Sequence, residues 1–207
     1  MIDLETLILL LPVLLVSLTL HELAHGVTAS LLGDPTPREH GRLTLNPIAH
    51  LDPLGTLLLI VTLLTTTFAF GWAKPVLVDP RYFKHPREGM AIVAVAGPAT
   101  NFVLALLCLV PIRFFEVSGQ TYDVLEAAFI VNVVLGVFNM MPVPPLDGSR
   151  IVAVLMPRAL YLRWASLDQY GFIILIAFIF LFRDQFQEVF DRTLSVVAGI
   201  MGLQVVS

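Results

Sequence analysis

Charged residues are scarce in this chain. Only 14% of its 207 residues are Asp, Glu, Lys or Arg, whereas 57% are hydrophobic. Soluble domains carry roughly 25% charged and 45–50% apolar residues. So few polar side chains cannot cover the surface of a water-soluble domain of this size. The composition therefore excludes an ordinary soluble protein and predicts an integral membrane protein, with residues 1–207 forming a single membrane-embedded domain.

The chain also has no excess of basic residues, and it has only one cysteine. The formal net charge is −4, which argues against nucleic-acid binding. Cys108 is the single cysteine, so an internal disulfide is impossible and cysteine usage does not indicate a compartment. The first apolar run has neither a basic start nor a small-residue cleavage site, so we interpret it as part of the mature chain rather than as a signal peptide. No internal repeat, linker or second domain is visible.

Long apolar runs are what the sequence contains instead. A helix that crosses a bilayer needs roughly 20 predominantly apolar residues, and we expect an all-α bundle of about four to six transmembrane helices. Gly97-Pro98 predicts an interruption of the third run, because proline removes a helical hydrogen bond. The runs cover residues 4–32, 54–70, 89–111, 126–141 and 170–182, and the tail from 183 is amphipathic at first and apolar from 194.

The charges of the connecting segments predict the topology. The segments 33–50, 72–88 and 142–170 are rich in basic residues, whereas 112–125 is acidic. Loops rich in Lys and Arg stay on the cytoplasmic side. The second apolar run, 54–70, then starts and ends on one side, so we interpret it as a re-entrant or β-hairpin element covered by other protein. An ordinary crossing with a weak charge signal is the alternative.

The strongest chemical motif lies inside the first apolar run. His21-Glu22-Leu23-Ala24-His25 matches the H-E-x-x-H pattern. Residues i and i+4 project from one helix face, so two imidazoles can reach one Zn²⁺ at about 2.0–2.1 Å each. Glu22 lies beside them, where it can take a proton from a metal-bound water. A purely structural cluster is the alternative, but polar groups at membrane depth are rare and usually functional.

A catalytic zinc site needs a third protein ligand besides two imidazoles, and it leaves one position open. His40, His50 and His85 lie in polar segments with no motif around them. Asp147 is the better candidate, because it follows a proline-rich turn and precedes Gly148, which gives the backbone freedom. A turn-stabilising aspartate is the alternative interpretation of this residue.

Together these motifs resemble the site-2 proteases, a family of intramembrane zinc metalloproteases, in their small bacterial and archaeal form without PDZ or nucleotide-sensing domains. The resemblance covers nearly the whole chain. It depends mainly on the H-E-x-x-H motif in a transmembrane helix and on Asn139 to Gly148 far downstream. Three further segments add to it: Ala96-Gly97-Pro98 followed by Asn101, Gly71 to Val76, and Leu45-Asn46-Pro47.

The resemblance implies that His21, His25 and Asp147 hold one zinc ion per chain. It implies that Glu22 is the general base and that Asn139 contacts the substrate or the developing oxyanion. The implied substrate is a transmembrane or membrane-proximal segment of a protein or peptide, and the expected location is a prokaryotic cell membrane, with lipid around the helices. If the N-terminus is outside, His21 lies roughly 26 Å along its helix at 1.5 Å per residue. The zinc is then expected toward the cytoplasmic side of a core about 30 Å thick.

Several interpretations stay open at this point. An extended substrate could pair with a strand edge, for which residues 65–70 or 43–48 are candidates. Asn101 and Asn132 are interpreted as bonding neighbouring helices, and Gly97 as permitting close helix packing. A metal transporter is one rival function, although no repeated halves are seen. An inactive membrane scaffold of the same fold is the other, and the intact Glu22 of the motif speaks against it.

Overall fold

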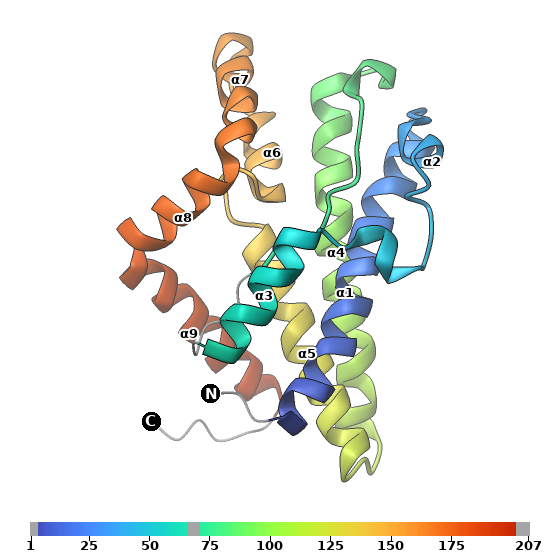
Figure 1. Ribbon diagram of the computed structural model, residues 1–207, viewed down its shortest axis with the longest axis vertical. Helices are drawn as coiled ribbons and strands as arrows, with labels where there is room; N and C mark the ends of the chain where they lie inside the picture. The colour runs from blue at the N-terminus through green and yellow to red at the C-terminus, as the bar shows by residue number, and fades with distance from the viewer. Residues whose placement is uncertain (1–3, 66–70, 202–207) are drawn as a thin grey trace.

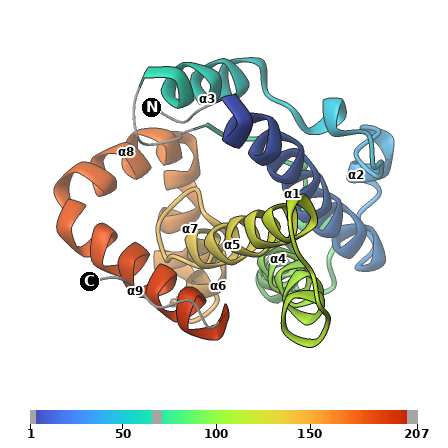
Figure 2. The ribbon, with the colours of Figure 1, turned by 90° about the horizontal axis from the view of Figure 1, so that it is seen from below.

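The computed structural model describes residues 4–65 and 71–201, and its regular structure within these ranges is helical, with no named β-strand. The expected all-α membrane architecture is therefore confirmed. Four helical stretches are long and apolar enough to cross a membrane: Ile8–Leu31, Pro86–Phe114, Gln120–Asn139 and Arg158–Leu181. The first three belong to a central bundle of α1 (Leu4–Leu31), α4 (Pro86–Phe114) and α5 (Gln120–Asn139), which pack side by side (Figures 1 and 2).

Helix α4 lies against both other helices of the bundle, and its sequence explains why. Its buried positions recur every three or four residues, which is the spacing of one helix face. Several of them are glycine or alanine, which let helix backbones approach closely in a membrane. The buried residues of α4 are Gly89, Met90, Val93, Ala94, Gly97, Pro98, Asn101 and Ala105.

The predicted interruption at Gly97-Pro98 is wrong, because α4 continues through both residues. A proline inside a helix removes only the hydrogen bond to the carbonyl four residues earlier. Membrane helices tolerate this loss where neighbouring elements pack around the freed backbone. Both residues are buried among such neighbours, so packing maintains the helix that local propensity would break.

The second apolar run forms α3 (Pro53–Thr65). The Asp52 carboxylate accepts a hydrogen bond from the Gly55 N–H at 2.9 Å, which is a helix cap. At 1.5 Å per residue α3 is about 20 Å long, shorter than a hydrocarbon core of about 30 Å. Leu51 and Ala73 form an antiparallel bridge, so the chain returns to the place from which it left. A short helix between adjoining ends agrees with the re-entrant interpretation, and no β-hairpin is formed by the described residues of this segment.

The two strand-edge candidates fare differently. Most of the 65–70 stretch lies outside the described residues. The 43–48 segment forms no strand, because Pro47–His50 is the short helix η1. The Asn46 side chain accepts from the Ile48 N–H at 3.1 Å, and Pro47 supplies the φ angle that a helical turn requires. A preformed strand edge at 43–48 is therefore not present.

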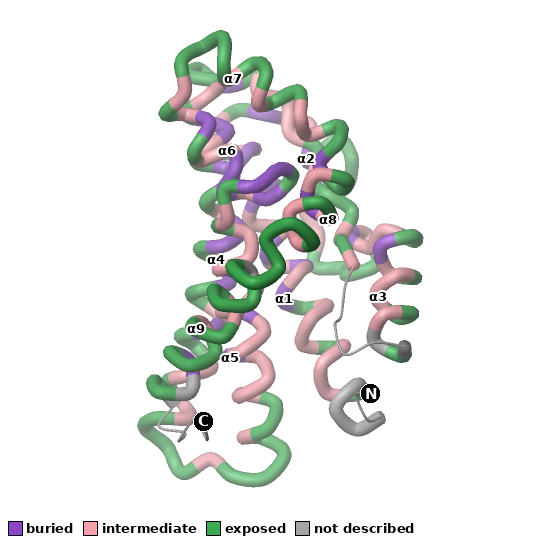
Figure 3. Tube along the Cα trace, turned by 90° about the vertical axis from the view of Figure 1, so that its left-hand side faces the viewer, coloured by how far each residue is buried: buried purple, intermediate pink, exposed green. Residues whose placement is uncertain are grey.

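The segment 142–170, expected as a loop, is largely helical. Figure 3 shows α6 among the buried parts of the chain, whereas α7 and α9 are largely exposed. The remaining short elements before α4 are α2 (Thr36–Glu39) and η2 (Pro80–Tyr82). The elements after α5 are α6 (Asp147–Ala153), α7 (Arg158–Ala165), η3 (Ser166–Tyr170), α8 (Gly171–Leu181) and α9 (Arg183–Met201).

One arginine of α4 attaches α6 and α7 to the central bundle. The Arg87 guanidinium donates to the backbone carbonyl of Val154 at 2.7 Å, and also to those of Ala153 and Met156. It lies over the Tyr161 ring at 4.9 Å from the ring centroid. The last carbonyls of a helix have no partner within the helix. Arg87 binds the last residue of α6 and two carbonyls of the turn that follows it, and it thereby fixes the position of α6 relative to α4.

Candidate metal centre

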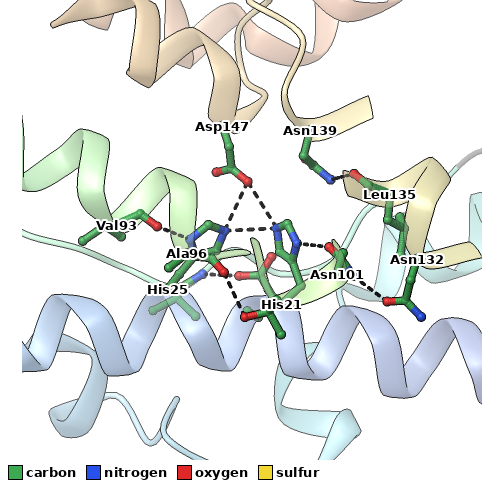
Figure 4. A network of polar contacts seen from close by, with 12 residues as sticks. His21, His25, Val93, Ala96, Asn101, Asn132, Leu135, Asn139 and Asp147 are labelled. Carbon is green, nitrogen blue, oxygen red and sulfur yellow. Dashed lines mark hydrogen bonds and ion pairs between the residues drawn. The ribbon is translucent and has the colours of Figure 1, made fainter. Parts of the chain in front are cut away.

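Three side chains from distant parts of the sequence converge beside α4. His21 and His25 project from one face of α1, and their Nε2 atoms are 3.0 Å apart. Asp147, the first residue of α6, directs Oδ2 between them, at 3.2 Å from His21 Nε2 and 3.3 Å from His25 Nε2 (Figure 4). Among the described residues, this is the one group of His, Cys, Asp and Glu side chains arranged to hold a metal ion.

Hydrogen bonds on the far side of each ring decide which nitrogen faces the group. His25 Nδ1 lies 2.7 Å from the Val93 carbonyl oxygen. Because a carbonyl can only accept, this nitrogen carries the proton of the neutral ring. His21 Nδ1 lies 2.6 Å from Asn101 Oδ1 and donates to it in the same way. Both Nε2 atoms therefore present lone pairs, as in metal sites where the second ring nitrogen is held by a hydrogen bond.

The donor set fits a tetrahedral metal ion. Two imidazole lone pairs and a carboxylate oxygen lie within 3.3 Å of one another, and Asp147 Oδ2 is buried with no hydrogen-bond partner. Such an arrangement is repulsive until a cation lies at its centre, either a metal ion or protons taken up by the rings. Ligands at about 2.0–2.1 Å from a tetrahedral zinc are about 3.3–3.4 Å apart. The observed triangle is close to this size.

Gly97 forms the floor of the group. A Cβ atom added there would lie 2.6 Å from both Cε1 and Nε2 of His21 and would also collide with His25 Nε2. No side chain fits at this position. The sequence interpretation of Gly97 as a residue that permits close packing is confirmed, and the packing partners are the two imidazoles.

A tight turn after α5 positions the aspartate. A Cβ atom on Gly148 would lie 2.5 Å from the Met141 carbonyl oxygen, so only glycine permits this approach. At the end of this turn one oxygen of the Asp147 carboxylate lies within 3.3 Å of both imidazoles, where it can share a cation with them.

A cavity of about 330 Å³ opens beside the group. Glu22 lines this cavity, and its Oε2 accepts a hydrogen bond from the Val76 N–H at 3.0 Å. Asn139, the last residue of α5, also lines it and donates from Nδ2 to the Leu135 carbonyl at 3.0 Å. Arg150 contributes a guanidinium that pairs with Asp168 at 2.9 Å. The cavity thus brings the predicted carboxylate and amide to the His-His-Asp group.

The loop histidines are not part of this group. His40 is exposed and bonds the Thr36 carbonyl at 2.9 Å. His50 is buried and bonds the Thr44 carbonyl at 3.0 Å. His85 precedes the first turn of α4. Sequence reasoning did not identify Val93 as the partner of His25. It interpreted Asn101 as bonding a neighbouring helix, and the bond is made to His21 of α1. The signal for Asn101 is its spacing of four from Gly97, which places both residues on the face of α4 toward α1.

A helical membrane protein with a His-His-Asp group beside a glutamate belongs to the class of membrane metallohydrolases. Comparison with known proteins agrees with this class. The profile of Peptidase family M50 matches residues 116–182. "Putative zinc metalloprotease YwhC" of Bacillus subtilis is 42% identical over 172 residues, which cover 79% of this chain and 76% of that protein.

A second relative is "Putative zinc metalloprotease Rip2" of Mycolicibacterium smegmatis, 32% identical over 164 residues that cover 78% of this chain and 62% of the relative. No solved structure matches this chain significantly. The chain belongs to Peptidase family M50, the site-2 protease family. It is accordingly a zinc metalloprotease and a membrane protein of bacterial type.

Proposed function

We propose that the chain is an intramembrane zinc endopeptidase that cuts transmembrane or membrane-proximal segments of protein substrates. The observation that carries this proposal is the position of the His-His-Asp group, which borders a cavity of about 330 Å³ among apolar helices. Ionisable groups at such places are costly and are normally retained for function. A peptide chain entering the cavity would meet the metal ligands, a carboxylate and an amide together.

His21 Nε2, His25 Nε2 and Asp147 Oδ2 are the proposed zinc ligands. Zinc bound there supplies Lewis-acid chemistry, which lowers the pKa of water and polarises a carbonyl group. The protein's own contribution is to keep these three atoms in place before the metal arrives. Val93 and Asn101 hold the rings from behind, and α6 presents the carboxylate from the opposite side.

Glu22 is the proposed general base. Its Oε2 already accepts the Val76 N–H, so Oε1 is the oxygen that takes the proton as water attacks the scissile carbonyl carbon. The new carbon–oxygen bond forms, the carbon–nitrogen bond then breaks, and Oε1 returns the proton to the leaving nitrogen. General acid–base assistance of this kind contributes typically about 10²–10⁴-fold to a rate.

Asn139 is the proposed partner of the developing oxyanion. Its Nδ2 carries two protons, and one of them is donated to the Leu135 carbonyl. We propose that the second is donated to the substrate oxygen in the cavity that Asn139 lines. A donor that stabilises an oxyanion is worth about 2.7–4 kcal/mol in other hydrolases.

We also propose that the site lies toward the cytoplasmic side. The basic segments 33–50 and 72–88 adjoin the end of α1 that carries His21 and His25. Basic loops stay in the cytoplasm, and water reaches a site near that surface more easily than one at the midplane.

The test compares cells that express the wild type, Glu22→Gln or Glu116→Gln, with membrane-protein fragments identified by mass spectrometry. Glu22→Gln should keep zinc, because glutamine replaces no proposed ligand, and should lose the fragments because an amide cannot take the proton. Glu116 is exposed in the segment between α4 and α5, so Glu116→Gln is the matched control and should cleave normally. Fragments that persist unchanged in Glu22→Gln would refute the protease mechanism as assigned.

The two rival functions make different predictions in the same experiment. A transporter distributes its ligands along a path, but the described residues contain one such group. It would move metal across vesicles without producing any fragments. An inactive scaffold would bind membrane clients equally well with glutamate or glutamine at position 22.

A further inference from the structure

Buried polar side chains of three helices form a row of hydrogen bonds. The row starts at His21 of α1, passes through α4 and α5, and returns to α1 at Ser17. Asn101 of α4 lies between His21 and Asn132, with its Nδ2 at 2.8 Å from Asn132 Oδ1. Asn132 of α5 donates from Nδ2 to Ser17 Oγ of α1 at 2.9 Å. The exposed fractions of Asn101, Asn132 and Ser17 are 0%, 2% and 2%. Water therefore does not compete for these bonds, and each amide must find its partners within the protein.

The donor-to-acceptor direction of this row of hydrogen bonds is fixed at Asn132. Asn132 also bonds the backbone carbonyl of Ala128 at 2.8 Å. Because a backbone carbonyl can only accept, the Asn132 atom that faces it must be the NH₂ group. Asn132 Oδ1 therefore faces Asn101, and only the Asn101 NH₂ group satisfies that oxygen.

The same reasoning continues to the imidazole. With its NH₂ group directed at Asn132, Asn101 has only its Oδ1 to present to His21 Nδ1, at 2.6 Å. The ring must then carry its proton on Nδ1 and leave Nε2 with a lone pair. His25 needs no such chain, because the backbone carbonyl of Val93 fixes its tautomer directly. The two imidazoles are thus oriented by different means.

We propose that Asn132 is a positioning residue, which acts through Asn101 to hold His21 in the tautomer that can bind a metal ion. This inference rests on the proposed zinc site. The oxygen and the NH₂ group of an amide have nearly the same size, so Asn101 without Asn132 can turn over. A turned Asn101 donates to His21 Nδ1, moves the ring proton to Nε2 and removes the lone pair from the metal site.

A double substitution separates this role from simple packing. Asn132→Leu keeps the approximate side-chain volume and removes the oxygen that orients the Asn101 amide. Asn101→Asp gives position 101 two oxygens, so either orientation accepts from His21 and Asn132 is no longer needed for direction. The measured quantity is the zinc dissociation constant of the purified full-length chain, from competition with a chromophoric chelator. The absorption spectrum of the cobalt-loaded protein reports in addition whether both imidazoles remain ligands.

Asn132→Leu alone should weaken zinc binding about 10–100-fold, the range found when a partner behind a metal ligand is lost. It should also change the cobalt spectrum. In the Asn101→Asp background, the same Asn132→Leu change should leave zinc binding at least as tight as in Asn101→Asp alone, because it also removes the Asn132 oxygen that faces the new carboxylate. Equal weakening in both backgrounds would overturn the proposal, because it would make Asn132 a packing residue. Unchanged binding in Asn132→Leu would overturn it as well.

The result also separates this inference from the proposed function. If the wild type binds no zinc, the metal centre fails and the positioning role fails with it. If the wild type binds zinc and cleaves membrane proteins while Asn132→Leu binds zinc normally, only the positioning role is refuted. Thermal unfolding of each variant, followed by far-ultraviolet circular dichroism, shows whether the variant has folded.

Discussion

Replacing Gly97 with alanine would introduce one methyl group directly beneath both imidazoles. The new Cβ would lie 2.6 Å from His21 Nε2, whereas ordinary van der Waals contact begins at 3.4 Å, so the ring must retreat by about 0.8 Å. Asn101 holds this ring by a short hydrogen bond, and the retreat breaks or bends that bond. Metal–ligand distances in zinc sites normally agree with their usual values within about 0.2 Å, so a shift of this size is large. We therefore expect Gly97→Ala to damage the metal centre rather than the fold as a whole.

The size of the effect follows from the cost of overpacking. Extra methyl groups in well-packed interiors cost about 1–3 kcal/mol, and about 1.4 kcal/mol corresponds to a tenfold change in a dissociation constant. If this strain is present in the zinc-bound protein and relieved in the zinc-free protein, zinc binding should weaken roughly 5- to 150-fold. Activity should fall at least in proportion, because fewer molecules carry the metal.

The assay is zinc affinity measured by chelator competition, together with thermal unfolding. Gly199→Ala faces open space and should change neither quantity. Wild-type zinc affinity in Gly97→Ala would refute the argument that the glycine is required by the two rings.

Three further predictions follow from the same structure. Purified wild type should hold about one zinc per chain and Asp147→Ala much less, because only two of three protein ligands remain. Equal zinc content by atomic spectroscopy would exclude Asp147 as a ligand. Arg87→Leu should lower the free energy of unfolding by about 1–3 kcal/mol, because three partly buried carbonyls at and after the end of α6 lose their donor. An unchanged unfolding temperature would contradict this role. In a background without the native cysteine, single cysteines placed in 33–50 and 72–88 should be labelled from one side of the membrane, and those in 112–125 from the other side. Labelling of 33–50 and 72–88 from opposite sides would make α3 a true crossing.

The sequence was informative wherever chemistry has a fixed local spacing. The four-residue step between His21 and His25 predicted two imidazoles on one helix face, and their Nε2 atoms lie 3.0 Å apart. Asp followed by Pro is a typical helix start, and α3 begins at Pro53 with Asp52 as its cap. Asp147 required the family resemblance, since an aspartate before a glycine is on its own a common turn residue.

The rest depended on contacts between distant segments. Nothing local identifies the Val93 carbonyl as the partner of His25, because the backbone of every residue offers the same atom. The continuity of α4 through Pro98 comes from packing that local propensity does not include. The helices within 142–170 are held by Arg87, which lies in the first turn of α4. Nearly all of α4 and the whole of α5 separate the two in the sequence.

The separation of the proposed ligands along the chain has a consequence for biosynthesis. His21 and His25 lie on the first membrane helix, but Asp147 follows α5. A ribosome that has delivered α1, α4 and α5 to the membrane has made both histidines and the proposed base Glu22, but not yet the proposed third ligand. On this assignment the three side chains come together only after α6 has been made and has packed against α4. Assembly of the proposed site is therefore a late step of biosynthesis and not a property of the first helix.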